Sequence, residues 1–169
     1  MKIAILGYSG SGKSTLAGQL GQRYQIPVLY LDTVQFEAGW KERDRTQALE
    51  MVDRFMQQEN WVIDGNYTAF RQQERLEQAD HIVILSFARL PCLWRAYKRL
   101  RTYRHTTRES MAPGCEEKMD AAFVWWLLYG GRKKERRARF AAIRRRYPEK
   151  CVVLKNQKQL DAFRQAPFA

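Results

Sequence analysis

An eight-residue glycine-rich string near the start of the chain restricts the fold more than any other feature. Residues 7–14 read Gly-Tyr-Ser-Gly-Ser-Gly-Lys-Ser, which fits the pattern G-x-x-x-x-G-K-[ST]. The apolar run 3–6 precedes the string, and apolar residues at helical spacing follow from about Ser14. A glycine-rich turn between a buried strand and a helix lets successive backbone N–H groups point at one anion, and the helix adds its positive N-terminal dipole. The string therefore predicts a phosphate-binding loop (P-loop) within an α/β domain.

Two side chains of this loop carry specific chemistry. Lys13 can reach the β- and γ-phosphates of a nucleoside triphosphate, and the Ser14 hydroxyl can coordinate Mg²⁺. The guanine-specific motif N-K-x-D is absent from the sequence, so we expect ATP. The residues expected to bind it are Gly7, Tyr8, Ser9, Gly10, Ser11, Gly12, Lys13, Ser14 and Thr15.

The rest of the chain alternates short apolar runs with helical patterns. We expect strands at residues 2–6, 28–31, 61–63, 81–87 and 151–154. We expect helices at 14–24, 42–58, 91–103, 116–129 and 157–165, with a further basic helix that follows a break at 130–131 and continues to 146. Continuous apolar strands that alternate with helices indicate a parallel sheet covered on both faces. No repeat or linker is visible, so residues 1–169 are expected to form one domain.

Composition limits the class of protein. Hydrophobic residues make up 45% of the chain and charged residues 28%, which are ordinary globular values. The apolar stretch 121–129 has roughly half the length of a membrane span, and the first apolar run is too short for a signal-peptide core. The three cysteines, Cys92, Cys115 and Cys151, form no CxxC pair. We therefore expect a soluble cytoplasmic protein with reduced cysteines and no membrane partner.

The positive charge of the chain is concentrated in one segment. The net charge is +12, and residues 89–146 hold 17 lysines and arginines against 5 aspartates and glutamates, while the remainder is neutral. Such an excess predicts a polyanionic partner at this segment, either the phosphates of a small ligand or a nucleic acid backbone.

Two carboxylates follow predicted strands on the P-loop side of the sheet. Asp64 ends the strand 61–63 and can hold Mg²⁺ opposite the hydroxyl of Ser14; alternatively it only caps a turn with Gly65 and Asn66. Asp32 ends the strand 28–31 and can bind or activate a hydroxyl group. With Phe36 and Trp40 it would form the wall of an acceptor site; alternatively these residues form a turn and part of the core.

The basic segment has two interpretations. In a kinase, Arg95 and Arg99 stand four residues apart on one helical face, and the facing arm carries Arg132, Lys133, Arg136 and Arg137. These cations would close over the nucleotide and neutralise charge on the transferred phosphoryl group. In a nucleic-acid-binding protein the same cations would contact backbone phosphates, with Trp125 and Trp126 stacking on bases. The run 123–129 that contains both tryptophans otherwise has the pattern of a buried helix, so we expect it in the core.

Taken together, these strings resemble the adenylate-kinase-related P-loop proteins, and among them the DNA topology modulation family. The resemblance runs nearly the full length and rests on the string 7–14, on Leu31-Asp32 with Phe36 and Gly39-Trp40, on 61–67, and on 114–120 with Phe123 and Trp126. It implies a three-layer P-loop NTPase fold with a five-stranded parallel sheet in the order 2-3-1-4-5. It also implies an acceptor-binding region near 32–60 and an arginine-rich lid near 100–135.

One departure from the related nucleoside monophosphate kinases concerns the acceptor. In those enzymes the string Asp-Gly-Phe-Pro-Arg ends the third strand. Here Asp64-Gly65 is followed by Asn66-Tyr67-Thr68, and the nearest arginine is Arg71. Asn66 and Arg71 are therefore the acceptor-site candidates in this region, and the resemblance does not fix the acceptor.

Two functions remain on the sequence alone. The favoured one is a phosphotransferase that moves the γ-phosphoryl group of ATP·Mg²⁺ to a small nucleotide-like or hydroxyl-bearing acceptor, with Lys13, Asp32, Arg95, Arg99, Arg132 and Arg136 as the catalytic candidates. The alternative is a nucleotide-dependent DNA- or RNA-binding regulator that uses segment 89–146. The first is favoured because a lid arginine can accelerate phosphoryl transfer by orders of magnitude, whereas the sequence indicates neither a recognition helix nor a stacking sheet.

Overall fold

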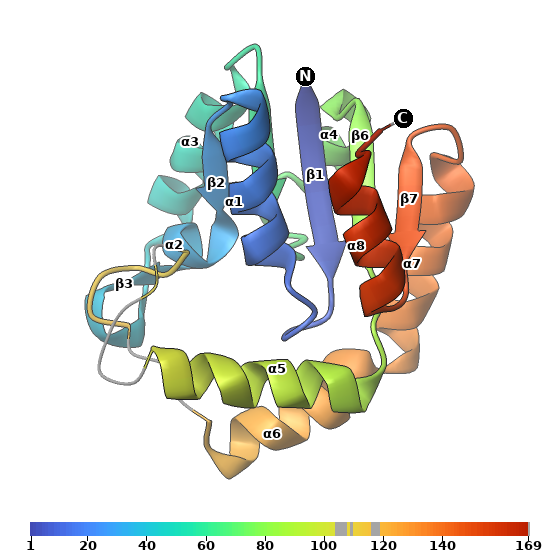
Figure 1. Cartoon of the computed structure of the whole chain (residues 1–169). Coiled ribbons are helices and arrows are strands. Elements are labelled where there is room, and N and C mark those ends of the chain that lie inside the picture. Colours follow the sequence, from blue (N-terminus) through green and yellow to red (C-terminus); the bar gives the residue numbers. More distant parts are fainter. Residues whose placement is uncertain (104–107, 109, 116–118, 169) are drawn as a thin grey trace.

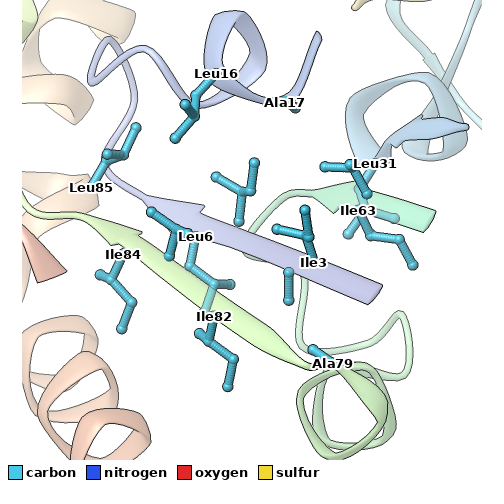
Figure 2. Packing of buried hydrophobic residues seen from close by; sticks show 14 of the residues in the cluster. Ile3, Leu6, Leu16, Ala17, Leu31, Ile63, Ala79, Ile82, Ile84 and Leu85 are labelled. Atoms are coloured by element: carbon cyan, nitrogen blue, oxygen red, sulfur yellow. The ribbon is translucent and has the colours of Figure 1, made fainter. Parts of the chain in front are cut away.

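The computed structural model describes residues 1–103, 108, 110–115 and 119–168. Its centre is the strand β1 (Lys2–Gly7), whose residues Ile3 to Leu6 are completely buried. Figure 2 shows why: Ile3 and Leu6 lie among apolar side chains of neighbouring strands and of the helices that cover the sheet. A strand buried on both faces needs apolar residues at successive positions, which is the pattern that the sequence has here.

The main sheet has five parallel strands. Its order is β2 (Val28–Tyr30), β5 (Trp61–Asp64), β1, β6 (His81–Leu85) and β7 (Cys151–Leu154). In chain numbering this order is 2-5-1-6-7 and differs from the expected 2-3-1-4-5. The difference arises because a short antiparallel pair, β3 (Phe36–Glu37) and β4 (Lys41–Glu42), intervenes between the second and third strands of the sheet. The five expected segments themselves lie side by side in the expected arrangement.

Helices cover both faces of this sheet (Figure 1). In front lie α1 (Lys13–Tyr24) and α8 (Gln157–Gln165). Behind it lie α3 (Arg45–Met56), α4 (Gln72–Gln78) and α7 (Lys134–Arg146). The helices α5 (Arg89–Thr102) and α6 (Ala121–Leu128) cross beyond the carboxyl end of β1, next to the P-loop, and the single turn η2 (Gly130–Arg132) joins α6 to α7.

Local structure differs from the expectation around Asp32. The expected strand 28–31 stops at Tyr30, and a short helix, α2 (Leu31–Gln35), begins at once. Asp32 therefore lies in the first turn of a helix and does not end the strand. The Gly39-Trp40 loop forms a single 3₁₀ turn, η1 (Ala38–Trp40), within the β3–β4 hairpin. The following helix starts at Arg45, because the Asp44 side chain accepts hydrogen bonds from the N–H groups of Thr46 and Gln47.

The expectation that the run 123–129 forms a buried helix is wrong. Residues 116–118 of the expected helix lie outside the described residues, and α6 begins at Ala121 with Asp120 as its N-cap. Within α6 only Leu127 is buried, whereas the Trp125 side chain is 59% exposed. The helix packs against α5 at the margin of the fold and is not placed under the sheet. A helix that packs on one side only must leave part of its aromatic surface in solvent.

Within the described part of the chain, every helix is too short or too polar to cross a bilayer.

Candidate nucleotide and acceptor site

The P-loop adopts backbone conformations that require its glycines. Gly12 has φ 95° and is the N-cap of α1, and Gly10 has φ 73°. A Cβ atom on Gly10 would lie 2.4 Å from the Cys92 carbonyl oxygen of α5, which excludes any side chain there. The loop therefore passes close under α5 and leads directly into the first turn of α1, whose N–H groups have no hydrogen-bond partner within the helix.

Tyr8 and Ser11 brace the inner side of this loop. The Tyr8 carbonyl oxygen accepts hydrogen bonds from Ser11 Oγ at 2.7 Å and from Lys13 Nζ at 3.2 Å. The Tyr8 ring is buried, 5.4 Å from the Phe140 ring, with the Arg132 guanidinium 4.0 Å from its centroid. Of the residues expected to bind ATP, Tyr8 can therefore offer only its backbone, whereas the Lys13 side chain lines the cleft beside the loop.

Ser14 and Asp64 meet at the point expected for magnesium. Ser14 Oγ donates a hydrogen bond to Asp64 Oδ2 at 2.7 Å. The other carboxylate oxygen, Oδ1, is buried and has no hydrogen-bond partner among the described residues. Burial raises the pKa of Asp64, and the nearby Lys13 and the Ser14 hydroxyl oppose that rise.

The oxygen atoms of Ser14 and Asp64 are suitable ligands for a magnesium ion. Mg²⁺ prefers hard oxygen ligands and is usually held by one or two protein oxygens together with phosphate and water. A hydroxyl and a carboxylate with an unmatched buried oxygen meet that requirement. Among the described residues, no three histidine, cysteine, aspartate or glutamate side chains lie close enough together to hold a metal ion, so any ion bound here would also need ligands from phosphate or water.

Asn66 is committed to the P-loop backbone. Its Oδ1 accepts from the Gly7 N–H at 3.0 Å, and its Nδ2 donates to the Gly7 carbonyl oxygen at 2.6 Å. Both polar ends of the amide are used, so the expected acceptor contact is replaced by a positioning role for the start of the loop.

Asp32 lies in the same cleft as the P-loop. The cleft has a volume of about 1160 Å³, and its lining includes Lys13, Ser14 and Asp32. The Asp32 carboxylate accepts a hydrogen bond from the Tyr67 hydroxyl at 2.8 Å. A phosphate bound at Lys13 and a molecule bound at Asp32 would therefore share one space, which is the arrangement that a transfer reaction needs.

The predicted lid arginines separate into two groups. Arg95 and Arg99 of α5 line the cleft. Arg95 also donates to the Ser11 carbonyl oxygen and to Gln157 Oε1, so it ties the P-loop to α5 and α8. Part of the expected lid, residues 104–107, 109 and 116–118, lies outside the described residues.

Arg132 and Arg136 do not line the cleft. The Arg132 guanidinium is buried and donates to the carbonyl oxygens of Leu127, Phe87 and Ala88 at 3.1, 2.7 and 3.4 Å. That of Arg136 lies 5.5 Å from the centroid of the Trp126 ring. Helical spacing identified these residues as cations near one another, but the break at Gly130-Gly131 turns Arg132 inward under Tyr8.

The predicted aromatic wall also lies elsewhere. The Phe36 and Trp40 rings meet edge to face at 5.3 Å and pack against the segment 111–115. The Trp40 N–H donates to Cys115 Sγ at 3.3 Å, and this thiol donates to the Glu37 carbonyl oxygen at 3.2 Å. Both rings thus fasten the β3–β4 hairpin and are absent from the lining of the cleft.

Arg71 lies outside the cleft. Its guanidinium pairs with Asp53 at 2.8 Å on the surface, and it is not part of the cleft lining. The nearest arginine in sequence to the Asp64 string therefore serves a surface ion pair.

Several residues near the site, among them Arg108, Ser110 and Arg75, were not predicted from the sequence. Arg108 and Ser110 line the cleft, and Arg108 also lines a neighbouring cavity of about 700 Å³ between α2 and the segment 111–113. Nothing in the sequence separated Arg108 from the other cations of the basic segment. Arg75 is completely buried and supports the chain that follows Asp64. Arg75 stands among polar residues in the sequence, and nothing in that pattern indicates that its side chain is buried.

Comparison with known proteins gives no family. No family model matches the chain, and no curated protein matches it, so the expected DNA topology modulation family is not confirmed. Similar solved structures include an uncharacterized protein from Eubacterium ventriosum, with 16% identity, TM-score 0.49 and coverage of 96% of this chain and 93% of that chain. A shikimate kinase from Bacteroides thetaiotaomicron has 17% identity, TM-score 0.47 and coverage of 98% and 94%.

A deoxyadenosine kinase from M. mycoides with bound dATP has 15% identity to this chain, with a TM-score of 0.49 and coverage of 98% of each chain. At this level of similarity none of these structures supports a conclusion about activity.

Proposed function

We propose that the protein is a phosphotransferase that moves the γ-phosphoryl group of ATP·Mg²⁺ to a small acceptor bound beside Asp32. One observation carries the proposal: a single cleft of about 1160 Å³ is lined by the P-loop at one place and by Asp32 at another. A protein that only bound nucleotide would not need a second carboxylate, besides Asp64, beside the same cleft.

The P-loop side supplies the binding of the triphosphate. The N–H groups of the loop and of the first turn of α1 would donate hydrogen bonds to phosphate oxygens, and Lys13 would neutralise charge on the β- and γ-phosphates. Ser14 and Asp64 would hold the magnesium ion, which neutralises charge between the β- and γ-phosphates when it is bound. The hydrogen bonds from Asn66 to Gly7 keep the start of the loop in place.

The cations of the cleft supply charge neutralisation. Arg99 and Arg108 line the cleft together with the P-loop. Arginines aimed at the equatorial oxygens of the transferred group stabilise the transition state, because negative charge is spread over those oxygens. Arg95 contributes in a different way, since its bond to the Ser11 carbonyl oxygen holds the P-loop against α5.

The test is turnover with a panel of acceptors. The protein is incubated with ATP, Mg²⁺ and nucleosides, nucleotides or small alcohols, and ADP release is followed. We expect acceptor-stimulated turnover that Lys13→Ala abolishes, because the triphosphate loses its cation, while the matched surface change Lys98→Ala has no effect. ATP binding by the Lys13→Ala protein as tight as that of the unchanged protein would contradict the proposal.

A second candidate function is nucleic-acid binding by the basic segment. It is favoured by the exposed Trp94 and Trp125 of α5 and α6, and by the Lys98 ammonium 5.5 Å from the Trp94 ring centroid. Exposed aromatic rings among cations suit base stacking and phosphate contacts. Tight, strongly salt-dependent binding of single-stranded DNA or RNA, unchanged by Lys13→Ala and without acceptor-stimulated turnover, would favour this candidate over the kinase.

A further inference from the structure

We infer that the acceptor is an alcohol, that its hydroxyl group is bound and deprotonated by Asp32, and that Tyr67 orients this carboxylate. The inference rests on the proposed function and adds two things to it: the chemical class of the acceptor and a positioning residue that the P-loop pattern does not contain.

The orientation of Asp32 comes from a residue 35 positions further along the chain. Asp32 lies in the first turn of α2, and Tyr67 lies in the connection between β5 and α4. The Tyr67 hydroxyl donates to Asp32 Oδ1 at 2.8 Å. Because this bond occupies one oxygen, the second oxygen, Oδ2, is the atom that can accept a hydrogen bond from an acceptor in the cleft.

Two contacts hold Tyr67 itself in place. Its ring stacks on that of Phe70 with the centroids 5.2 Å apart, and its carbonyl oxygen accepts from Arg75 Nη2 at 2.8 Å. Arg75 is completely buried and also donates to the carbonyl oxygens of Phe70 and Gly65. The hydroxyl group of Tyr67 is therefore placed by a braced loop, and the orientation of Asp32 follows from that brace.

The Tyr67 hydroxyl remains a hydrogen-bond donor throughout the neutral range. Burial raises the pKa of Tyr67 far above its ordinary value, and the charges of Asp32, Asp64 and Glu42 raise it further. The same three carboxylates make the electrostatic potential around the Tyr67 hydroxyl negative. Each of them would therefore repel a second negative charge bound beside Asp32. A phosphate acceptor would have to bind against them, whereas an uncharged hydroxyl group would not.

Two described arginines, Arg43 and Arg108, line the cavity beside α2. Arg43 pairs with Glu37 at 3.3 Å and donates to the Val34 carbonyl oxygen at 3.0 Å. The positive charges of Lys13 and Arg108 both lower the pKa of Asp64, the proposed magnesium ligand. Of the arginines near Asp32 that the structure describes, Arg43 is therefore already paired with a carboxylate, and Arg108 lies between this cavity and the cleft.

The proposed reaction is a direct transfer of the γ-phosphoryl group from ATP to the acceptor hydroxyl. The acceptor hydroxyl donates to Asp32 Oδ2, and its oxygen forms a bond to the γ-phosphorus of ATP. The bond from that phosphorus to the bridging oxygen breaks, and the electron pair leaves with ADP. The hydroxyl proton passes to Asp32 and is later released to solvent, so the products are a phosphate monoester and ADP.

The class of acceptor is tested with matched pairs of compounds. Nucleosides, monosaccharides and polyols are compared with their own monophosphates, with ADP release as the rate and ³¹P NMR to identify the product. We expect a new monoester from the alcohols. Turnover with monophosphates only, or turnover with no alcohol by a protein that binds ATP·Mg²⁺, would overturn the inference and leave the nucleotide site intact. A protein that does not bind ATP·Mg²⁺ at all would overturn the proposed function instead.

The role of Tyr67 is tested with Tyr67→Phe, which keeps the ring and removes the hydroxyl group. We expect kcat to fall about 10-fold and Asp32→Asn to lower it by about 100-fold or more, which is the usual contribution of a general base. The KM for ATP should stay within about 2-fold in both variants, because neither residue contacts the triphosphate. The exposed Tyr97 of α5 supplies the matched control, Tyr97→Phe, with unchanged kcat.

The double variant separates positioning from a general structural effect. If Tyr67 acts through Asp32, Tyr67→Phe should cause no further loss of kcat in the Asp32→Asn background. A further 10-fold loss in that background, or an unchanged kcat in the single Tyr67→Phe variant, would overturn the positioning role. Thermal unfolding of all four proteins shows that the compared variants are folded.

Discussion

At the residue scale, the buried carboxylate of Asp64, which we propose as a magnesium ligand, lowers the stability of the folded protein. Its carboxylate is buried and one oxygen lacks a partner among the described residues, so the folded protein holds a poorly solvated negative charge. We expect Asp64→Asn to raise the free energy of unfolding at pH 7 by about 1 kcal/mol. Replacing a destabilising active-site residue often stabilises a protein by such an amount. Mg²⁺-dependent turnover should be lost in the same variant, and urea denaturation without nucleotide measures the first effect.

The pH dependence of this difference has a definite sign. Because the pKa of Asp64 is raised in the folded protein, the folded state binds the proton more readily than the unfolded state. The destabilisation is therefore fully present above the raised pKa and disappears as the pH falls through it toward the ordinary carboxyl value. The advantage of Asp64→Asn should shrink over that interval. A constant or growing advantage on acidification would contradict this account, and the exposed Asp161→Asn serves as the control.

At the scale of elements, the connection between β5 and α4 depends on one buried side chain. Arg75 donates to the carbonyl oxygens of Gly65, Tyr67 and Phe70, and burial lowers its pKa to about 10, still well above neutrality. We expect Arg75→Met to lower the free energy of unfolding by about 3 kcal/mol, because three buried carbonyl groups lose their donor. Equilibrium denaturation measures the loss. The exposed Arg54→Met on α3 should change stability by less than about 0.5 kcal/mol, and equal effects of the two changes would refute the brace.

At the scale of the whole molecule, α5 brings part of the cationic segment across the carboxyl end of the central strand, directly over the P-loop (Figure 1). A ligand that bridges the P-loop and α5 should stabilise the entire fold. With ATP·Mg²⁺ at 100 times its dissociation constant, we expect about 2.7 kcal/mol of stabilisation and a rise in Tm of about 5 to 10 °C. Differential scanning fluorimetry tests this shift. Lys13→Ala should show none of it, and chelation of magnesium with EDTA should reduce it.

The P-loop, the five strands and their parallel arrangement could be predicted because each depends on neighbouring residues. A glycine-rich turn, an apolar run of four residues or a helical period is complete within a dozen positions, and a parallel sheet follows from the alternation of strands and helices. The pairing of Ser14 with Asp64 could also be anticipated, since both follow adjacent strands at the same edge of the sheet.

The tertiary structure alone decided which side chains enter the cleft. Arg95 and Arg99 line it while Arg132 is buried among backbone carbonyl groups, and Trp125 is exposed although its neighbours predicted a core helix. The hydrogen bond between Tyr67 and Asp32 joins the β5–α4 connection to the first turn of α2, and no local pattern connects these two segments. The sequence determined a phosphate-binding loop in a parallel α/β fold. The acceptor side was decided only by the fold, because its contacts form between segments whose approach depends on the packing of the entire molecule.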